Sequence, residues 1–185
     1  MAFIHATTMA PTKLELLTAW LPRQDWYVGT GAPQLSRVGG FRLDDPAGEV
    51  GIELQLVRDD ALERPVVYHV PMTYRGEPLP GAEAALIGTA EHGVLGRRWV
   101  YDAVHDPVAL RQIAALLTRA VIAQHQNKSD TPDPTVHVVD PQPPGADVRF
   151  RVVRTPEPGP ITSGVTAEWR APDDTVVRGG VVVLT

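Results

Sequence analysis

The residues best suited to bind a ligand gather between positions 97 and 106 of this 185-residue sequence. Two arginines precede a tryptophan there, and an aspartate and a histidine follow in the next turn. Guanidinium groups pair with anions, and aromatic side chains stack on the face of a ring. The predicted site for an anionic or sugar ligand, or for a partner, comprises Trp26, Tyr27, Arg97, Arg98, Trp99, Asp102 and His105.

A structural role also explains these residues. Neighbouring residues of a strand point to opposite faces, so either Arg97 or Arg98 faces the covered side and needs a carboxylate partner. The candidate partners are Asp102, Glu53 and Glu83. In this interpretation the aromatic side chains belong to the core.

A second hypothesis concerns acid–base or metal chemistry at the same turn. His92 and His105 flank the strand together with Asp102, and carboxylates orient imidazole groups. Their spacing matches no zinc pattern, and Asp106 before Pro107 has the form of a helix N-cap. We therefore predict no metal and no cofactor. An enzyme of unrecognised type, using the His/Asp/Arg cluster near residues 97–106, remains the alternative.

Signatures of familiar enzyme classes are absent from the sequence. Gly29-Thr30-Gly31 lacks the strand–loop–strand setting of a nucleotide-covering loop, and there is no P-loop, kinase catalytic loop or Asp-Phe-Gly. There is no Gly-x-Ser-x-Gly elbow and no cysteine nucleophile. These observations favour a non-catalytic protein.

A helix from Pro107 to about Gln124 is the element that we expect to organise the fold. It carries a long apolar stripe, and Arg111 and Arg119 are its only formal charges. A helix so poor in charge is typical of one wrapped by a curved sheet. A second stripe of Val108, Ala115 and Ile122, together with the apolar end of the chain at 181–184, raises the possibility of a self-associating structural protein or homodimer.

The remaining elements follow from capping and period-two patterns. Thr12 and Glu15 form a capping box at the start of a helix that ends near Pro22. Residues 50–57 and 66–74 alternate and should pair as a hairpin, with Pro71 at an edge or bulge. Further strands are expected at residues 3–8, 38–43, 86–89, 94–101, 136–139, 148–153, 165–170 and 176–184.

Composition narrows the class of protein. The chain is 43% hydrophobic with a net charge of -5 and no basic block, which is typical of a globular protein that does not bind nucleic acid. No apolar run approaches the roughly 20 residues of a membrane helix, and no signal peptide is evident. The absence of cysteine fits a reducing compartment, so we expect a cytoplasmic protein.

A series of short motifs resembles a known family, the N-terminal cap domain of maltokinases. The motifs are Trp20-Leu21-x-x-Gln24-x-Trp26-Tyr27-x-Gly29, Tyr68-x-Val70, Ile87-Gly88 and Tyr101-Asp102, in order between about residues 13 and 124. The sequence is still more similar to stand-alone actinobacterial cap-like proteins, often labelled 1,4-alpha-glucan branching protein. Those share stretches similar to 41–46, 68–71 and 96–102. A branching-enzyme barrel needs about 250 residues, so that label does not fit a chain of 185 residues.

The resemblance implies an α+β fold in which a curved antiparallel sheet wraps a central helix, as a cystatin-like cap, with additional C-terminal β-strands. Residues 1–126 would form the cap-like domain and residues 127–185 a β extension on the same sheet. Maltokinase catalytic residues lie in kinase lobes, which are missing here, so none is carried over. The resemblance therefore implies a binding or regulatory role in α-glucan, maltose or trehalose metabolism. The partner would be a kinase or another pathway protein in trans, or a carbohydrate.

Overall fold

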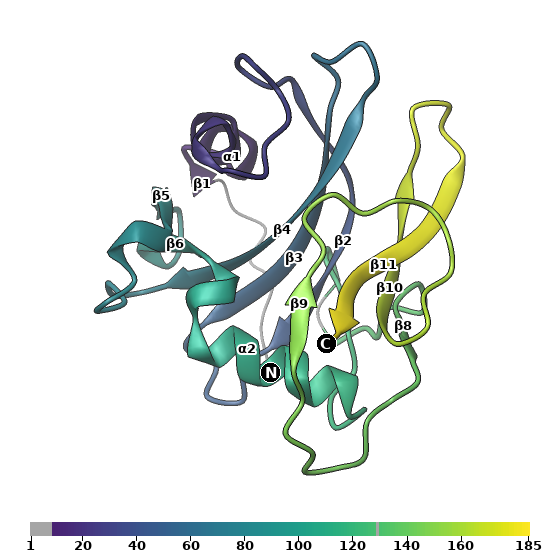
Figure 1. Ribbon diagram of the computed structural model, residues 1–185. Helices are drawn as coiled ribbons and strands as arrows, with labels where there is room; N and C mark the ends of the chain where they lie inside the picture. Colours follow the sequence, from purple (N-terminus) through teal and green to yellow (C-terminus); the bar gives the residue numbers. More distant parts are fainter. Residues whose placement is uncertain (1–8, 129) are drawn as a thin grey trace.

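The computed structural model describes residues 9–128 and 130–185, which form a curved sheet flanked by short helices (Figure 1). Every strand pairing in these residues is antiparallel. The predicted α+β class with a curved antiparallel sheet is confirmed. The strand predicted at residues 3–8 lies outside the described residues. No helix among the described residues is long and apolar enough to span a membrane.

The strand bounds are β1 (Met9–Ala10), β2 (Leu35–Asp44), β3 (Gly51–Asp59), β4 (Val66–Arg75), β5 (Leu86–His92), β6 (Gly96–Asp102), β7 (Gln124–His125), β8 (His137–Val139), β9 (Phe150–Val152), β10 (Gly164–Arg170) and β11 (Val176–Leu184). Their order in the sheet is β1-β5-β6-β4-β3-β2-β10-β11-β9. β7 pairs with β2, and β8 pairs with β10. The four C-terminal strands predicted from the sequence are all present.

The central hairpin is the predicted one, because β3 pairs with β4 along its whole length. Pro71 immediately precedes the β4 residues that pair with β6, so its missing N–H falls outside that ladder, as expected for an edge position. The alternation of residues 50–57 is typical of a strand with one buried face, but β3 is buried along most of its length. Both faces are covered, and Glu53 and Gln55 are only 4% and 1% exposed.

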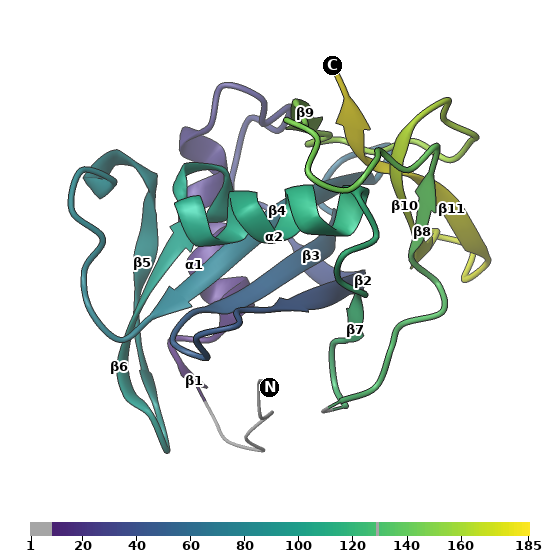
Figure 2. The same ribbon diagram turned by 90° about the horizontal axis from the view of Figure 1, so that it is seen from below.

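Two α-helices cover opposite faces of the central strands (Figure 2). α1 (Lys13–Trp20) begins with the predicted capping box between Thr12 and Glu15, and the 3₁₀ helix η1 (Leu21–Arg23) continues it. α2 (Pro107–Leu117) begins at the predicted N-cap Asp106. The short 3₁₀ helix η2 (Glu83–Ala85) precedes the β5–β6 hairpin in the chain, and η3 (Ala103–His105) follows it.

The prediction that α2 extends to Gln124 was wrong. Arg119 adopts a left-handed conformation with φ 57°, which ends the helix after Leu117 and lets β7 reach β2. Ile122 therefore lies outside the helix and is 63% exposed, so it does not share a helical stripe with Val108 and Ala115.

The core around α2 collects residues from distant parts of the sheet. Ile113 and its neighbours on the helix pack in one cluster with Leu54 of β3 and Val182 of β11. A second cluster lies under α1 and includes Leu17 and Val70. The apolar β11 is paired with both β10 and β9, so its residues 182–184 pair within the sheet and do not form an unpaired edge.

Candidate functional site

Arg97 and Arg98 point to opposite faces of β6, as predicted. The side chain of Arg97 is 64% exposed and pairs with Glu91, with 2.9 Å between Nε and Oε1. The predicted carboxylate partner was for the arginine on the covered side, which is Arg98. No described carboxylate oxygen lies within 4.0 Å of Arg98, so the predicted pairing with Asp102, Glu53 or Glu83 was wrong. Arg98 is half-buried on the face that α1 covers.

Trp26 and Asp102 are brought together by an arginine that sequence reasoning missed. Arg154 Nη2 lies 2.5 Å from Asp102 Oδ2, and its guanidinium lies 4.8 Å from the ring centre of Trp26. Trp26 also packs edge-on against Trp20. This arrangement fixes residues of the C-terminal part against β6 and the loop after α1, which is a structural role for both predicted residues.

The other predicted site residues have separate surroundings. Tyr27 donates its hydroxyl hydrogen to Asp59, at 3.1 Å, or to the Gly31 carbonyl, at 3.0 Å, and burial with the Asp59 contact raises the pKa of Tyr27 to about 12. Trp99 packs in a small cluster with Tyr101. His105 is exposed at the end of η3.

The proposed histidine cluster is not assembled. His92 pairs with Gly96 at one end of the β5–β6 ladder, whereas Asp102 and His105 follow the opposite end. Asp106 is fully buried, caps α2 and receives two hydrogen bonds of 2.7 Å from Arg75. Among residues 9–128 and 130–185 there is no group of three histidine, cysteine, aspartate or glutamate residues placed to hold a metal ion.

A recessed pocket of about 390 Å³ opens elsewhere on the α1 face of the sheet. It lies between the start of α1, the β2–β3 turn and the β5–β6 hairpin. Lining residues include Met9, Lys13, Arg42, Glu49, Val50, Glu53, Tyr74, His92, Leu95, Arg98 and Gln126. Of the predicted site residues, only Arg98 belongs to it.

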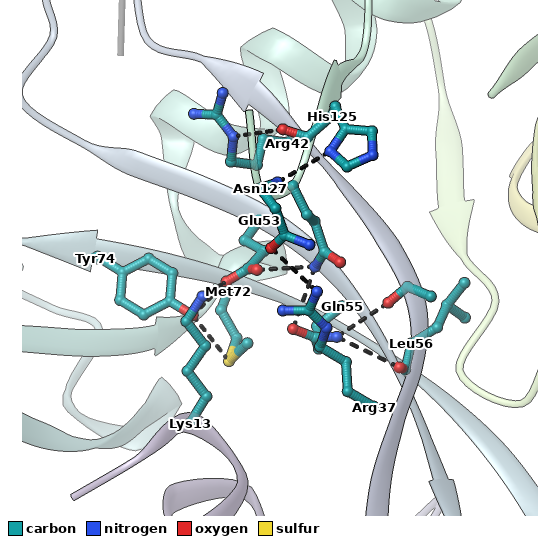
Figure 3. Close-up of polar contacts among 12 residues, drawn as sticks. Lys13, Arg37, Arg42, Glu53, Gln55, Leu56, Met72, Tyr74, His125 and Asn127 are labelled. Atoms are coloured by element: carbon teal, nitrogen blue, oxygen red, sulfur yellow. Dashed lines mark hydrogen bonds and ion pairs between the residues drawn. The ribbon is translucent and has the colours of Figure 1, made fainter. Parts of the chain in front are cut away.

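Glu53 is the centre of the polar contacts in this pocket (Figure 3). Its Oε2 accepts hydrogen bonds from Lys13 Nζ at 2.5 Å and from the Tyr74 hydroxyl at 2.8 Å. Its Oε1 accepts from Gln126 Nε2 at 2.8 Å, and the same amide lies 3.2 Å from Gln55 Oε1. A carboxylate has about four acceptor positions, and these contacts occupy three of them on Glu53, whose side chain is 5% exposed.

Local backbone features bring Gln126 to Glu53. The β2–β3 register shifts between Arg37 and Gly39, and Gly40 follows with φ 131°. A Cβ atom on Gly40 would lie 2.7 Å from Gln126 Nε2 and 2.5 Å from the Leu54 carbonyl oxygen. Glycine at this position therefore leaves the space through which the residue after β7 reaches β3.

The charges at the base of the pocket are neutralised internally. Lys13 neutralises Glu53, although its own side chain stays 38% exposed. Burial, together with the Glu53 carboxylate, raises the pKa of Tyr74 well above its usual value, so its hydroxyl remains a hydrogen-bond donor. The base thus offers hydroxyl, amide and carboxylate groups without a net charge.

The sequence did not identify the residues at the base of the pocket, which are Lys13, Glu53, Tyr74 and Gln126. The available signal was polar residues on the face of β3 and β4 that also bears Val57 and Val70. A buried carboxylate on such a face needs a partner. Lys13 and Gln126 could not be assigned as its partners, because they are 40 and 73 residues away in the sequence.

The fold and pocket together define an α+β protein with a curved antiparallel sheet and a recessed, hydrogen-bonding cavity. Comparison with known families adds that residues 20–106 match the family model of the maltokinase N-terminal cap domain. This segment is therefore similar to the maltokinase N-terminal cap domain. The match ends at Asp106 and so excludes α2, and it also excludes Lys13 and Gln126.

Proposed function

We propose that this protein is a non-catalytic, cap-like binding protein of α-glucan, maltose or trehalose metabolism, and that it holds a polyhydroxylated ligand in the Glu53 pocket. The observation that carries the proposal is the buried Glu53 network in a cavity of about 390 Å³. Cavities of about 300–1,000 Å³ with a few convergent polar groups are typical of small-molecule sites.

The chemistry of the pocket suits a sugar. Each sugar hydroxyl both donates and accepts a hydrogen bond, and the pocket base presents donors and acceptors side by side. Apolar side chains such as Met9, Val50 and Leu95 also line the cavity and match the C–H faces of a sugar ring. The ion pair between Lys13 and Glu53 leaves the base of the pocket without a net charge, so hydroxyl groups suit the base better than ions.

The family match supports the metabolic assignment. A cap-like segment without kinase signatures in the sequence suits a protein that binds a kinase or another pathway protein in trans. The cystatin-like arrangement is part of this proposal and is supported by the packing of α2 against β2 and β3 and against β10 and β11. Affinity capture followed by mass spectrometry should recover a protein of that pathway, and its absence would count against the partner.

Calorimetric titration with maltose and trehalose tests the ligand. The wild-type protein should bind at least one of them, and Glu53→Gln should weaken binding by tenfold or more because it removes an acceptor and leaves Lys13 unpaired. Arg97→Gln is the matched control, since Arg97 is exposed and outside the pocket. Absence of binding to either sugar, or equal loss in both variants, would refute the proposal. Circular dichroism checks that each variant is folded.

A further inference from the structure

Arg98 differs from the other half-buried arginines in the described residues. The half-buried arginines, including Arg98 itself, are Arg42, Arg58, Arg75, Arg98, Arg154 and Arg178. Each except Arg98 has a carboxylate oxygen within 4.0 Å. A partly buried cation without a counterion is unfavourable, so its presence needs an explanation.

The protein satisfies little of the hydrogen-bonding capacity of Arg98. Its Nη2 donates to the Leu95 carbonyl at 2.6 Å, and its buried Nε has no hydrogen-bond partner among the described residues. A guanidinium group carries five N–H donors, so most of them have no protein acceptor here. The group packs against Gly76, where a Cβ atom would lie 2.8 Å from Nη1.

The other cations of the pocket are already occupied. Lys13 is bound to Glu53, and Arg42 donates to the carbonyls of His125 and Lys128 and lies 3.7 Å from Asp44. Glu49, the exposed acid of the lining, forms no ion pair with Arg98 within 4.0 Å. Arg98 is therefore the lining cation whose charge no described carboxylate balances.

We propose that Arg98 is the oxyanion-binding residue of the pocket and that the preferred ligand is a polyhydroxylated molecule bearing a phosphate or carboxylate group. This inference rests on the proposed function, because it adds a charged subsite to the sugar pocket. The planar guanidinium presents parallel N–H groups that match two oxygens of such a group. The base around Glu53 then contacts the hydroxyl-rich part, and Arg98 on the β5–β6 hairpin contacts the anionic end.

Calorimetric titration of the full chain tests this assignment with maltose, maltose 1-phosphate and inorganic phosphate at low salt. The phosphorylated sugar should bind at least tenfold more tightly than maltose. In Arg98→Gln the advantage, measured against that variant's own affinity for maltose, should fall below twofold. Arg97→Gln, one residue away, should retain the full advantage. Arg98→Lys should retain part of it, because lysine keeps the positive charge but lacks the parallel N–H donors of the guanidinium group.

The possible failures of the two proposals are distinguishable. Equal affinity for maltose and its phosphate overturns the role of Arg98 and leaves the sugar pocket intact. Binding of inorganic phosphate that Arg98→Gln abolishes, without binding of either sugar, supports the oxyanion site and overturns the polyhydroxylated ligand. An equal loss in Arg97→Gln and Arg98→Gln shows only long-range attraction and overturns the subsite. Matching near-ultraviolet circular dichroism spectra establish that the variants are folded.

Discussion

Replacing Asp106 should reveal how strongly the turn before α2 stabilises the fold. Asp106 is fully buried, and it both caps α2 and accepts two 2.7 Å hydrogen bonds from Arg75. Asp106→Asn keeps a good capping side chain but removes the charge. Breaking a buried ion pair costs about 3–5 kcal/mol, and because the Arg75 side chain is 19% exposed we expect about 3 kcal/mol.

Asp106→Ala should lose about 1 kcal/mol more, because it also removes the helix cap. Urea unfolding measures both changes, and with a slope of about 2 kcal/mol per molar urea the midpoint of Asp106→Asn should fall by roughly 1.5 M. Arg75→Met provides the double-mutant cycle. In its background the loss caused by Asp106→Asn should be smaller by about 2 kcal/mol or more, because no guanidinium is left unpaired.

The pH dependence gives a second check on the same pair. Burial alone would raise the pKa of Asp106, but the hydrogen bonds from Arg75 and the Val108 N–H help to offset it, and the pKa is lowered below its usual value. A lowered folded-state pKa contributes stability above the unfolded value of about 3.9 that is lost as pH falls through the folded-state pKa. The difference between wild type and Asp106→Asn should therefore shrink below about pH 4. Additive losses, or a difference that does not change with pH, would refute the ion-pair argument.

Two further substitutions test how the site and the C-terminal strands are held, each against a matched control. Gly40→Ala should lower the free energy of unfolding through two effects. Backbone strain should cost about 1–2 kcal/mol, and overlap of the added Cβ with Leu54 and Gln126 should cost roughly 1–3 kcal/mol. The variant should also bind ligand more weakly. Gly81→Ala, at φ 80° with no atom within 4 Å of its Cβ and outside the pocket lining, should show only the backbone effect and leave binding unchanged. If the two glycine variants lose the same free energy of unfolding and bind ligand equally well, the close contact between residue 40 and Gln126 is contradicted. Arg154→Met should cost about 3 kcal/mol, because it leaves Asp102 buried without its cation, whereas Arg170→Met should stay within about 0.5 kcal/mol, because its pair with Asp174 is exposed.

Local patterns in the sequence predicted the elements of the fold well. The capping box at Thr12, the N-cap at Asp106 and the β3–β4 hairpin depend on residues close together in the chain, and all three are present. The end of α2 was missed because Arg119 takes the left-handed position that glycine usually marks. No local pattern distinguishes such an arginine from one that continues the helix.

The site was harder to predict than the fold, because its contacts join residues far apart in sequence. The strand period showed correctly that Arg97 and Arg98 face opposite sides, but it did not show which side held a cavity. Trp26 and Asp102 were identified as unusual residues, and Arg154 supplies a structural reason for both. Glu53 was identified only as a candidate partner of an arginine on β6, because its actual partners Lys13 and Gln126 could not be placed beside it from the sequence.

The composition of the pocket bears on how far the family match can be carried. Glu53, Tyr74 and Arg98 lie within the matched residues 20–106, whereas Lys13 and Gln126 lie outside them. Lys13 neutralises Glu53, and Gln126 occupies one of its acceptor positions. Both outside residues therefore help to determine whether the pocket accepts a neutral or a charged ligand. A cap-like segment that shared only the matched residues would expose Glu53 with different partners, so the ligand proposed here depends on this chain's own Lys13 and Gln126 as well as on the cap-like segment.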